Sequence, residues 1–135
     1  MIVVVVSITS RCTLKPSSRE VFSKSMDIII PEDVEVTQDE FHAMWQDFSI
    51  NYDIALTEKQ MTKLTQSIRK STFYNPHKFF RKAVTQDMLI ERNNIKAVWI
   101  KSEFGYVFQN ADNHYTYSAK IDTIGGIATF YKAHD

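Results

Sequence analysis

The chain has 135 residues, of which 44% are hydrophobic, 24% charged and 13% aromatic, and its formal net charge is zero. Its three glycines, three prolines and one cysteine exclude a collagen-like or low-complexity chain, an internal disulfide and a zinc site built from several cysteines. A chain of this length predicts one domain with one core, and the single cysteine favours a reducing, cytoplasmic location.

The charges are distributed unevenly along the chain. Residues 1–58 have 4 basic and 10 acidic residues (net −6), residues 59–86 have 7 basic and none acidic (net +7), and residues 87–135 have 5 basic and 6 acidic (net −1), which sum to zero. Within the first block, residues 27–58 carry nine acidic residues and no Lys or Arg. Blocks of opposite sign indicate surfaces for charged partners. The alternative is that one block neutralises the other within the molecule.

The N-terminal stretch at residues 2–8 is a continuous β-branched run, which predicts a buried strand that would add to the sheet. It is too short for a membrane span and lacks the basic region of a secretory signal, so we expect no membrane segment. After a polar stretch, Met26 precedes a second short strand at residues 27–31 and is an alternative start of the chain. We therefore predict an N-terminal strand and extension over residues 1–26 and a single α+β domain over residues 27–135.

Three helix-start signals follow, each succeeded by apolar residues at helical spacing. The predicted helices begin at the capping boxes of Thr37 and Thr57 and at Asn75, where Asn precedes a proline at the first helical position. The third helix is expected to end near residue 87 or 90. The apolar face of the first is formed by Phe41, Met44, Trp45 and Phe48.

After residues 93–94 the pattern changes to short runs rich in β-branched and aromatic residues, separated by turn formers such as Gly125-Gly126. The predicted strands are residues 97–101, 105–109, 115–121 and 127–132. The predicted fold class is thus α+β: a three-helix N-terminal half followed by a three- to four-stranded antiparallel meander.

The order of three helices and a hairpin resembles the winged-helix family. Residues 56–64 are similar to the second helix of a helix-turn-helix, residues 76–86 to its recognition helix and residues 97–109 to the wing hairpin. The resemblance covers roughly residues 37–110. It implies a winged-helix-like fold and a small protein that binds DNA or RNA.

The basic stretch supplies the candidate nucleic-acid-binding residues. On a helix that starts at Pro76, three cations lie on one side and form a patch for phosphates, with one arginine suited to a bidentate contact with guanine. Two further cations end the preceding helix, and a nearby tyrosine is suited to stacking on an unpaired base. The predicted site residues are Arg69, Lys70, Tyr74, Lys78, Arg81 and Lys82.

Two other functions stay open. The acidic block at residues 27–58 would suit a basic protein partner, as in an inhibitor or immunity-like protein. A small ribonuclease-like enzyme would use His114 as general acid, Glu91 or Glu103 as base and Lys101 as phosphate clamp. The histidines lack metal-ligand spacing and no glycine-rich phosphate loop is present, so we expect no metal or cofactor and favour a non-enzymatic binding protein.

Overall fold

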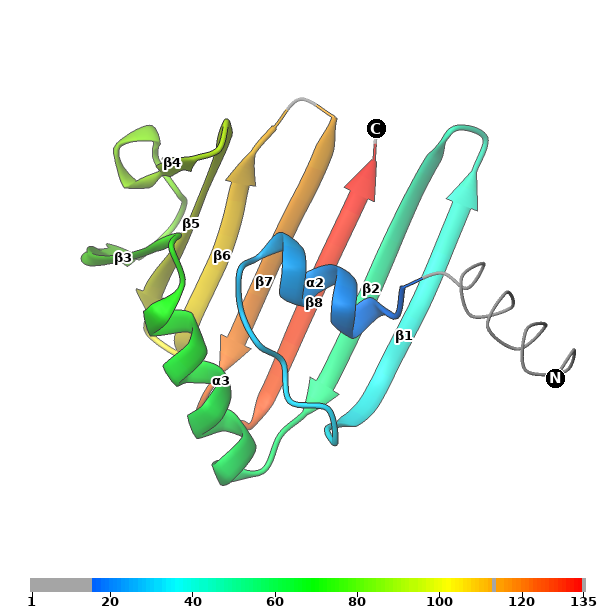
Figure 1. The fold of residues 1–135 in the computed structure, drawn as a ribbon, viewed down its shortest axis with the longest axis horizontal. Coiled ribbons are helices and arrows are strands. Elements are labelled where there is room, and N and C mark those ends of the chain that lie inside the picture. The colour runs from blue at the N-terminus through cyan, green and yellow to red at the C-terminus, as the bar shows by residue number, and fades with distance from the viewer. Residues whose placement is uncertain (1–15, 113, 135) are drawn as a thin grey trace, which may run out of the picture.

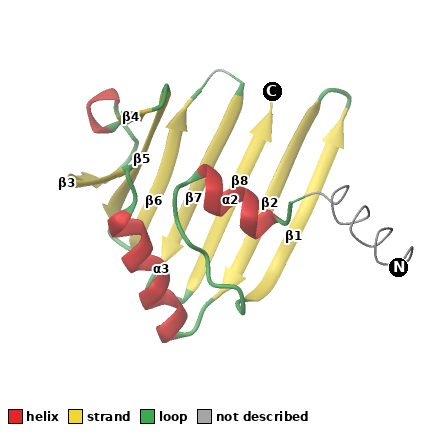
Figure 2. Cartoon of the chain, in the orientation of Figure 1, coloured by secondary structure: helices red, strands yellow, loops and turns green. Residues whose placement is uncertain are grey.

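The computed structural model describes residues 16–112 and 114–134 and shows one sheet of eight strands with two α-helices on one face (Figure 1, Figure 2). The strand order is β1-β2-β8-β7-β6-β5-β3, and β4 pairs with β5 beside this path. Every pair is antiparallel except β3 with β5, which is parallel.

The elements have the following bounds. The helices are α2 (Ser18–Ser25) and α3 (Glu58–Lys70), and a short 3-10 turn is η1 (Gln86–Met88). The strands are β1 (Glu35–Met44), β2 (Asp47–Ala55), β3 (Tyr74–Phe80), β4 (Ile90–Arg92), β5 (Ile95–Ser102), β6 (Gly105–Ala111), β7 (Tyr115–Asp122) and β8 (Ile127–His134).

The core fills the space between the helices and the sheet face that they cover, which we call the helix face. The indole of Trp99 lies at its centre, donates from Nε1 to the Met26 carbonyl at 2.8 Å and packs on Phe108 with ring centroids 5.1 Å apart. Burying such apolar area is the main contribution to the stability of a domain of this size. Other fully buried members of the core are Phe22, Ile30, Ile54, Leu64, Ile68, Ile121 and Phe130.

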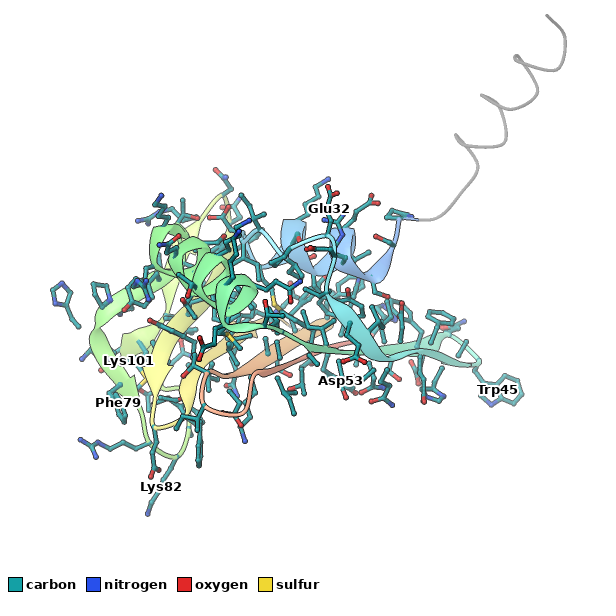
Figure 3. All side chains as sticks on the ribbon, turned by 90° about the horizontal axis from the view of Figure 1, so that it is seen from below. Glu32, Trp45, Asp53, Phe79, Lys82 and Lys101 are labelled. Atoms are coloured by element: carbon teal, nitrogen blue, oxygen red, sulfur yellow. The ribbon has the colours of Figure 1, made fainter. Side chains whose placement is uncertain are left out.

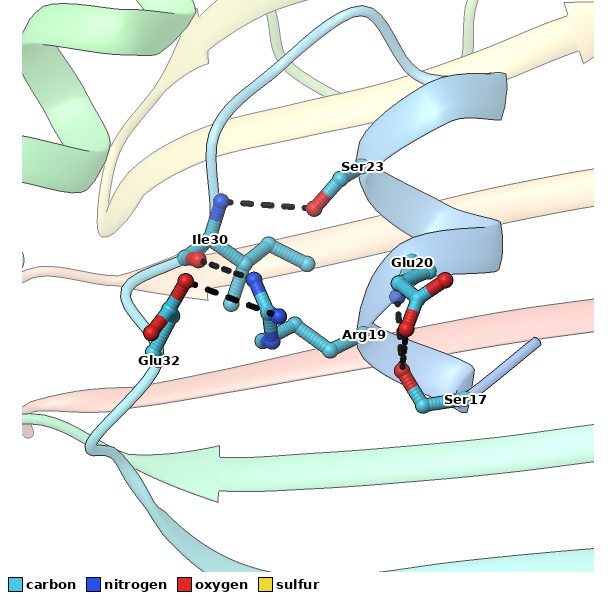
Figure 4. Close-up of polar contacts among 6 residues, drawn as sticks. All are labelled: Ser17, Arg19, Glu20, Ser23, Ile30 and Glu32. Carbon is cyan, nitrogen blue, oxygen red and sulfur yellow. Dashed lines mark hydrogen bonds and ion pairs between the residues drawn. The ribbon is translucent and has the colours of Figure 1, made fainter. Parts of the chain in front are cut away.

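Helix α2 was not expected in the polar stretch before Met26. Ser17 is its N-cap and accepts from the backbone N–H of Glu20 at 3.2 Å. Figure 4 shows how α2 is tied to the next loop: Arg19 donates to the Ile30 carbonyl at 3.4 Å, and the Ser23 hydroxyl accepts from the Ile30 N–H at 3.4 Å. Arg19 also lies 4.0 Å from the carboxylate of Glu32. These contacts tie α2 to the loop that follows it, while burial of Phe22 and Met26 packs this segment onto the core.

The helix predicted from Thr37 is wrong, because this segment forms the antiparallel hairpin β1–β2. Phe41 lies opposite Ile50 in the ladder, and the rings of Phe41 and Phe48 stack at 5.8 Å across the two strands. Trp45 occupies the turn with a φ of 59°. The apolar residues that would lie on one side of the predicted helix instead meet across two neighbouring strands.

The third predicted helix is also wrong. Residues from Tyr74 form β3, which pairs with β5 at Tyr74 and again at Phe79, with an irregular stretch between them. Pro76 lies in that stretch of an edge strand, where its missing N–H costs no ladder bond. The Asn75 side chain accepts from the His77 N–H at 3.1 Å, so Asn75 supports an extended turn and not a helix cap.

These two corrections overturn the three-helix half. The winged-helix and helix-turn-helix assignments are wrong, because the described part of the chain contains only α2 and α3 and is mainly sheet. A recognition helix for duplex DNA is therefore not present at residues 76–86. The strand expected at residues 27–31 is a loop.

Other elements agree with the predictions. The capping box of Thr57 and Gln60 begins α3 as expected, and the four predicted C-terminal strands are β5 to β8. Gly126 lies in the β7–β8 turn with a φ of 72°. The strand predicted at residues 2–8 lies outside the described residues. The boundary at residue 26 stays a prediction, although Phe22 and Met26 both belong to the core. In the described ranges, no helix is long and apolar enough to cross a membrane.

Candidate functional site: a groove on the open face of the sheet

The face of the sheet opposite α2 and α3, which we call the open face, carries a broad groove. Alternation along the strands places its side chains: Tyr52 and Phe130 point into the core, so their neighbours Asp53 and Tyr131 point the other way. Figure 3 shows the labelled Asp53 and Lys82 on the side of the sheet away from the helices. The groove has a volume of about 1010 Å³.

The floor of the groove is formed by two rows of side chains that cross the strands. Strand register places each row in order from β2 through β8 and β7 to β6. Most of these side chains are uncharged hydrogen-bonding groups, while the lining of the groove as a whole is mainly apolar, so the groove suits a ligand with both polar and apolar parts. The rows are Asn51, Tyr131, Ser118 and Gln109, and Asp53, Thr129, Lys120 and Val107.

Two segments form the walls. One is the chain from Phe79 to Lys82 at the end of β3, and the other is the β5–β6 turn with Phe104 at its tip. The turn is fixed because the Phe104 carbonyl accepts from the Thr123 N–H at 3.0 Å and from the Thr123 hydroxyl at 3.0 Å. The Phe104 side chain is 47% exposed, which leaves ring surface for a ligand.

The cations of the groove lie beside aromatic rings. The Arg81 guanidinium is 5.4 Å from the centre of the Phe79 ring, and the Lys120 ammonium is 5.1 Å from that of Phe104. In the part of the chain that the structure describes, neither cation has a carboxylate partner, and the same holds for Lys82. These charges are therefore available to an anion.

Asp53 places one carboxylate at the β2 end of the floor. Burial raises its pKa above the ordinary value, and the negative charge of Glu40 raises the pKa further. Both causes disfavour the charged form. Asp53 and Lys120 stand two strands apart, roughly 10 Å by strand spacing, so the anionic and cationic parts of the groove are separate.

The structure does not bring the six predicted site residues together, and four of them are divided between the two faces. Arg81 and Lys82 line the groove on the open face. Arg69 and Lys70 end α3 on the helix face, where Arg69 donates to the Tyr106 hydroxyl at 2.9 Å.

Tyr74 and Lys78 contribute to the structure elsewhere. Tyr74 packs edge-on against Tyr106 at 6.1 Å, and its pKa is raised by burial first and by Tyr106 second. Lys78 forms an ion pair with Asp87 at 3.1 Å. The single helical patch of Lys78, Arg81 and Lys82 does not exist, because these residues are not on a helix.

The groups of the ribonuclease hypothesis do not converge. His114 follows β6 at one end of that strand, whereas Glu103 precedes it at the other end. Glu91 pairs in register with Lys96, which is five residues along β5 from Lys101. At about 3.4 Å per residue these separations exceed the reach of hydrogen bonds. Within the described ranges, no group of three or more His, Cys, Asp or Glu side chains is arranged to hold a metal.

Sequence reasoning missed the groove residues of the meander: Phe104, Gln109, Ser118, Lys120, Thr129 and Tyr131. The alternation within residues 115–121 already placed Ser118 and Lys120 on one face of a strand. The missing step was the pairing of β8 with β2, which extends this face to Asn51 and Asp53.

No protein-family model matches the sequence, and neither a curated protein nor a solved structure is significantly similar to it.

Proposed function

We propose that this chain is a binding protein whose open-face groove holds a nucleotide unit, either free or within single-stranded DNA or RNA. One observation carries the proposal: Arg81 and Lys82, without ion-pair partners among the described residues, line the same groove as the exposed ring of Phe104 and the hydrogen-bonding floor. A nucleotide joins a phosphate, a sugar and a flat base, and this combination of cations, hydrogen-bonding groups and aromatic rings complements all three.

The phosphate would bind at the wall. Arg81 and Lys82 are exposed and adjacent in sequence, and Lys120 faces them from β7. Hydrogen bonds to charged groups contribute about 1.5–3 kcal/mol each, so two or three such contacts suffice for measurable affinity. The Asp53 carboxylate is at the other side of the floor, which orients an anionic ligand with its charge toward the wall.

The base and sugar would lie over the rings and the floor. Stacking of a base on an aromatic side chain contributes about 1–3 kcal/mol, and Phe104 and Tyr131 are both partly exposed at the groove. The amides of Asn51 and Gln109 and the hydroxyl of Ser118 supply donors and acceptors for sugar hydroxyls and base edges. The expected cytosolic location remains part of this proposal.

The test compares AMP, adenosine, inorganic phosphate and single-stranded hexa-adenylate in calorimetric titrations. We expect AMP to bind more tightly than adenosine or phosphate alone, because it engages both the rings and the cations. If the natural ligand is a single strand, hexa-adenylate binds more tightly than AMP and its affinity falls with salt by about 0.7 log units per phosphate contact per log unit of salt.

Arg81→Gln with Lys82→Gln should weaken AMP binding by at least about tenfold, because two charge-assisted contacts are lost. Lys59→Gln with Lys63→Gln is the matched control, since both lysines are exposed on α3 and the change in net charge is the same. If no probe binds, or if the α3 control weakens AMP binding as much as the groove variant does, the proposal is wrong.

A further inference from the structure

The outer edge of β1 has no neighbouring strand among the described residues. β1 has ten residues, so this edge is roughly 34 Å long at the usual rise per residue. An unpaired edge of this kind presents a row of backbone N–H and C=O groups that can pair with another extended chain.

The edge has part of the protection that proteins usually give such strands, namely three carboxylates, of which Asp39 points to the helix face, and one bulge. Lys, Arg and Pro, which discourage edge pairing, do not occur in residues 35–44. The one irregularity is a bulge between Val36 and Gln38, and the pairing with β2 is continuous from Gln38 to Met44. A second strand could therefore align along most of the length of β1.

The side chains of β1 differ between its two faces. Glu35 and Glu40 are on the open face, because they lie opposite Ala55 and Asn51 of β2. Val36 and Phe41 are on the helix face, where they are 49% and 58% exposed. Asp39 also lies on the helix face, opposite Tyr52, where its carboxylate accepts from the Ser18 hydroxyl at 2.6 Å. An added strand would therefore meet the carboxylates of Glu35 and Glu40 on the open face, and on the helix face the apolar Val36 and Phe41 beside this hydrogen-bonded carboxylate. The neighbouring hairpin turn adds Asp47 and a Trp45 side chain that is 98% exposed.

This charge argues against a second copy of the chain as the occupant. Two β1 edges related by a twofold axis would pair antiparallel and bring the carboxylates of both copies onto one narrow seam. Like charges directly opposite each other in a sheet are destabilising. The only basic group on the strand is His42, and its Nε2 is already 3.0 Å from Glu40.

We propose that the edge of β1 docks an extended basic segment of a partner protein, which adds to the sheet as a ninth strand. The segment would alternate Lys or Arg with apolar residues, so that its cations lie beside Glu35 and Glu40 and its apolar side chains beside Val36 and Phe41. Backbone hydrogen bonds supply affinity and the alternating side chains supply specificity in this mode of recognition. The proposal uses the edge of β1, which borders the β2 end of the groove floor, and does not depend on nucleotide binding.

The test uses a fluorescent octapeptide in which Lys and Val alternate, titrated against the full chain in an anisotropy assay. Two control peptides have the same composition: one has four Lys followed by four Val, and the other is the alternating peptide with N-methyl groups on every second backbone nitrogen. We expect the alternating peptide to bind at least tenfold more tightly than either control. Hydrogen exchange should show new protection of β1 amides on binding.

The variant Glu35→Lys with Glu40→Lys should lower the affinity for the alternating peptide by at least tenfold. Its matched control is Glu58→Lys with Glu91→Lys, which makes the same change in charge at exposed positions away from β1. Equal binding of the N-methylated peptide would show simple charge attraction and overturn strand addition. Failure of the alternating peptide to bind, or protection without it of the β1 amides that point away from β2, would also overturn the proposal.

Discussion

The two ends of the sheet carry opposite charge and present it in different ways. At the β3–β5 end, cations lie on a folded wall beside aromatic rings and face a groove. At the β1–β2 end, carboxylates lie along a straight strand edge that no described strand covers. Figure 3 shows Lys82 at one end of the molecule and Trp45 at the other. The net charge of zero is therefore the sum of two charged surfaces. The cationic groove wall has the shape for a compact ligand, and the acidic edge of β1 has the shape for an extended chain.

The two sequence blocks meet beside α3, where Asp27 and Asp33 line one pocket with Lys63 and Lys70, and they are far apart at the two ends of the sheet. No ion pair in the described ranges joins a residue of the acidic block at 27–58 to one of the basic block at 59–86. β1 and β3 are six strand spacings apart, roughly 29 Å along the sheet. This exceeds the screening length of about 8 Å at physiological salt, so the carboxylates of β1 do not neutralise the cations at the end of β3.

Both surfaces depend on the shared core. Substituting the buried Trp99 should disturb both surfaces, whereas substituting the exposed Trp45 should leave the core intact. Trp99→Ala should lower the free energy of unfolding by about 3–5 kcal/mol, because it leaves a cavity beside Phe108 and removes the donor to the Met26 carbonyl. Binding at both ends should be lost together. Urea denaturation followed by circular dichroism measures the change.

Trp45→Ala is the control for this prediction. The Trp45 side chain is 98% exposed, so its removal should change the free energy of unfolding by no more than about 0.5 kcal/mol. A large loss of stability from Trp45→Ala would show that the acidic hairpin is part of the core and would remove the contrast between the two ends.

The hairpin also shows what the sequence could have predicted. In residues 47–54 the apolar residues alternate strictly with polar ones, and this period of two is that of a half-buried strand. The helical spacing from Phe41 to Phe48 matched a helix only because it combines residues from two strands and a turn. The apparent capping box at Thr37 lies within a strand, whereas the equivalent pattern at Ser17 and Glu20 does begin a helix.

The groove could not be predicted because it depends on long-range pairing. Lys120 and Asp53 share one surface only because β8 lies between β7 and β2 and pairs with both. Arg81 and Lys82 join them only because β3 adds in parallel beside β5. Local patterns predict such strands but not their order in the sheet. The six-residue site therefore rested on the run of basic residues and on a predicted helix that does not form.

A smaller effect is expected at Asp53, the carboxylate of the groove floor. Because burial and Glu40 raise its pKa in the folded state, its ionised form opposes folding above that pKa, and stability increases as the pH falls through it. Asp53→Asn should abolish this pH dependence. It should also strengthen AMP binding at pH 7 by about two- to fivefold, because one repulsive charge is removed at moderate distance.

The matched control for Asp53→Asn is Asp47→Asn, a change of the same charge on the open face of the same strand. It should leave AMP binding within twofold of the unchanged protein in the same titration. If both variants strengthen AMP binding equally, the ligand responds to the overall charge of the hairpin and does not lie over Asp53.

The smallest effect is predicted for Lys78, and it separates the groove from a continuous basic stretch. Lys78 is neutralised by Asp87 at 3.1 Å and does not line the groove, so Lys78→Ala should change AMP affinity by less than twofold.

The pKa of Asp87 is lowered by the hydrogen bonds from Thr85 and from Lys78, and the loss of the Lys78 hydrogen bond should raise that pKa toward its usual value. The lowered pKa of Asp87 stabilises the folded state at pH values above the unfolded-state pKa, and this stabilisation is lost as the pH falls through the folded-state pKa. Lys78→Ala should therefore reduce the stability of the folded state at neutral pH. Carboxyl NMR titration of Asp87 measures this shift, while calorimetry measures the affinity. A large loss of AMP binding in Lys78→Ala would show that the ligand follows the whole basic stretch of β3 and would contradict the confinement of the site to the wall at Arg81 and Lys82.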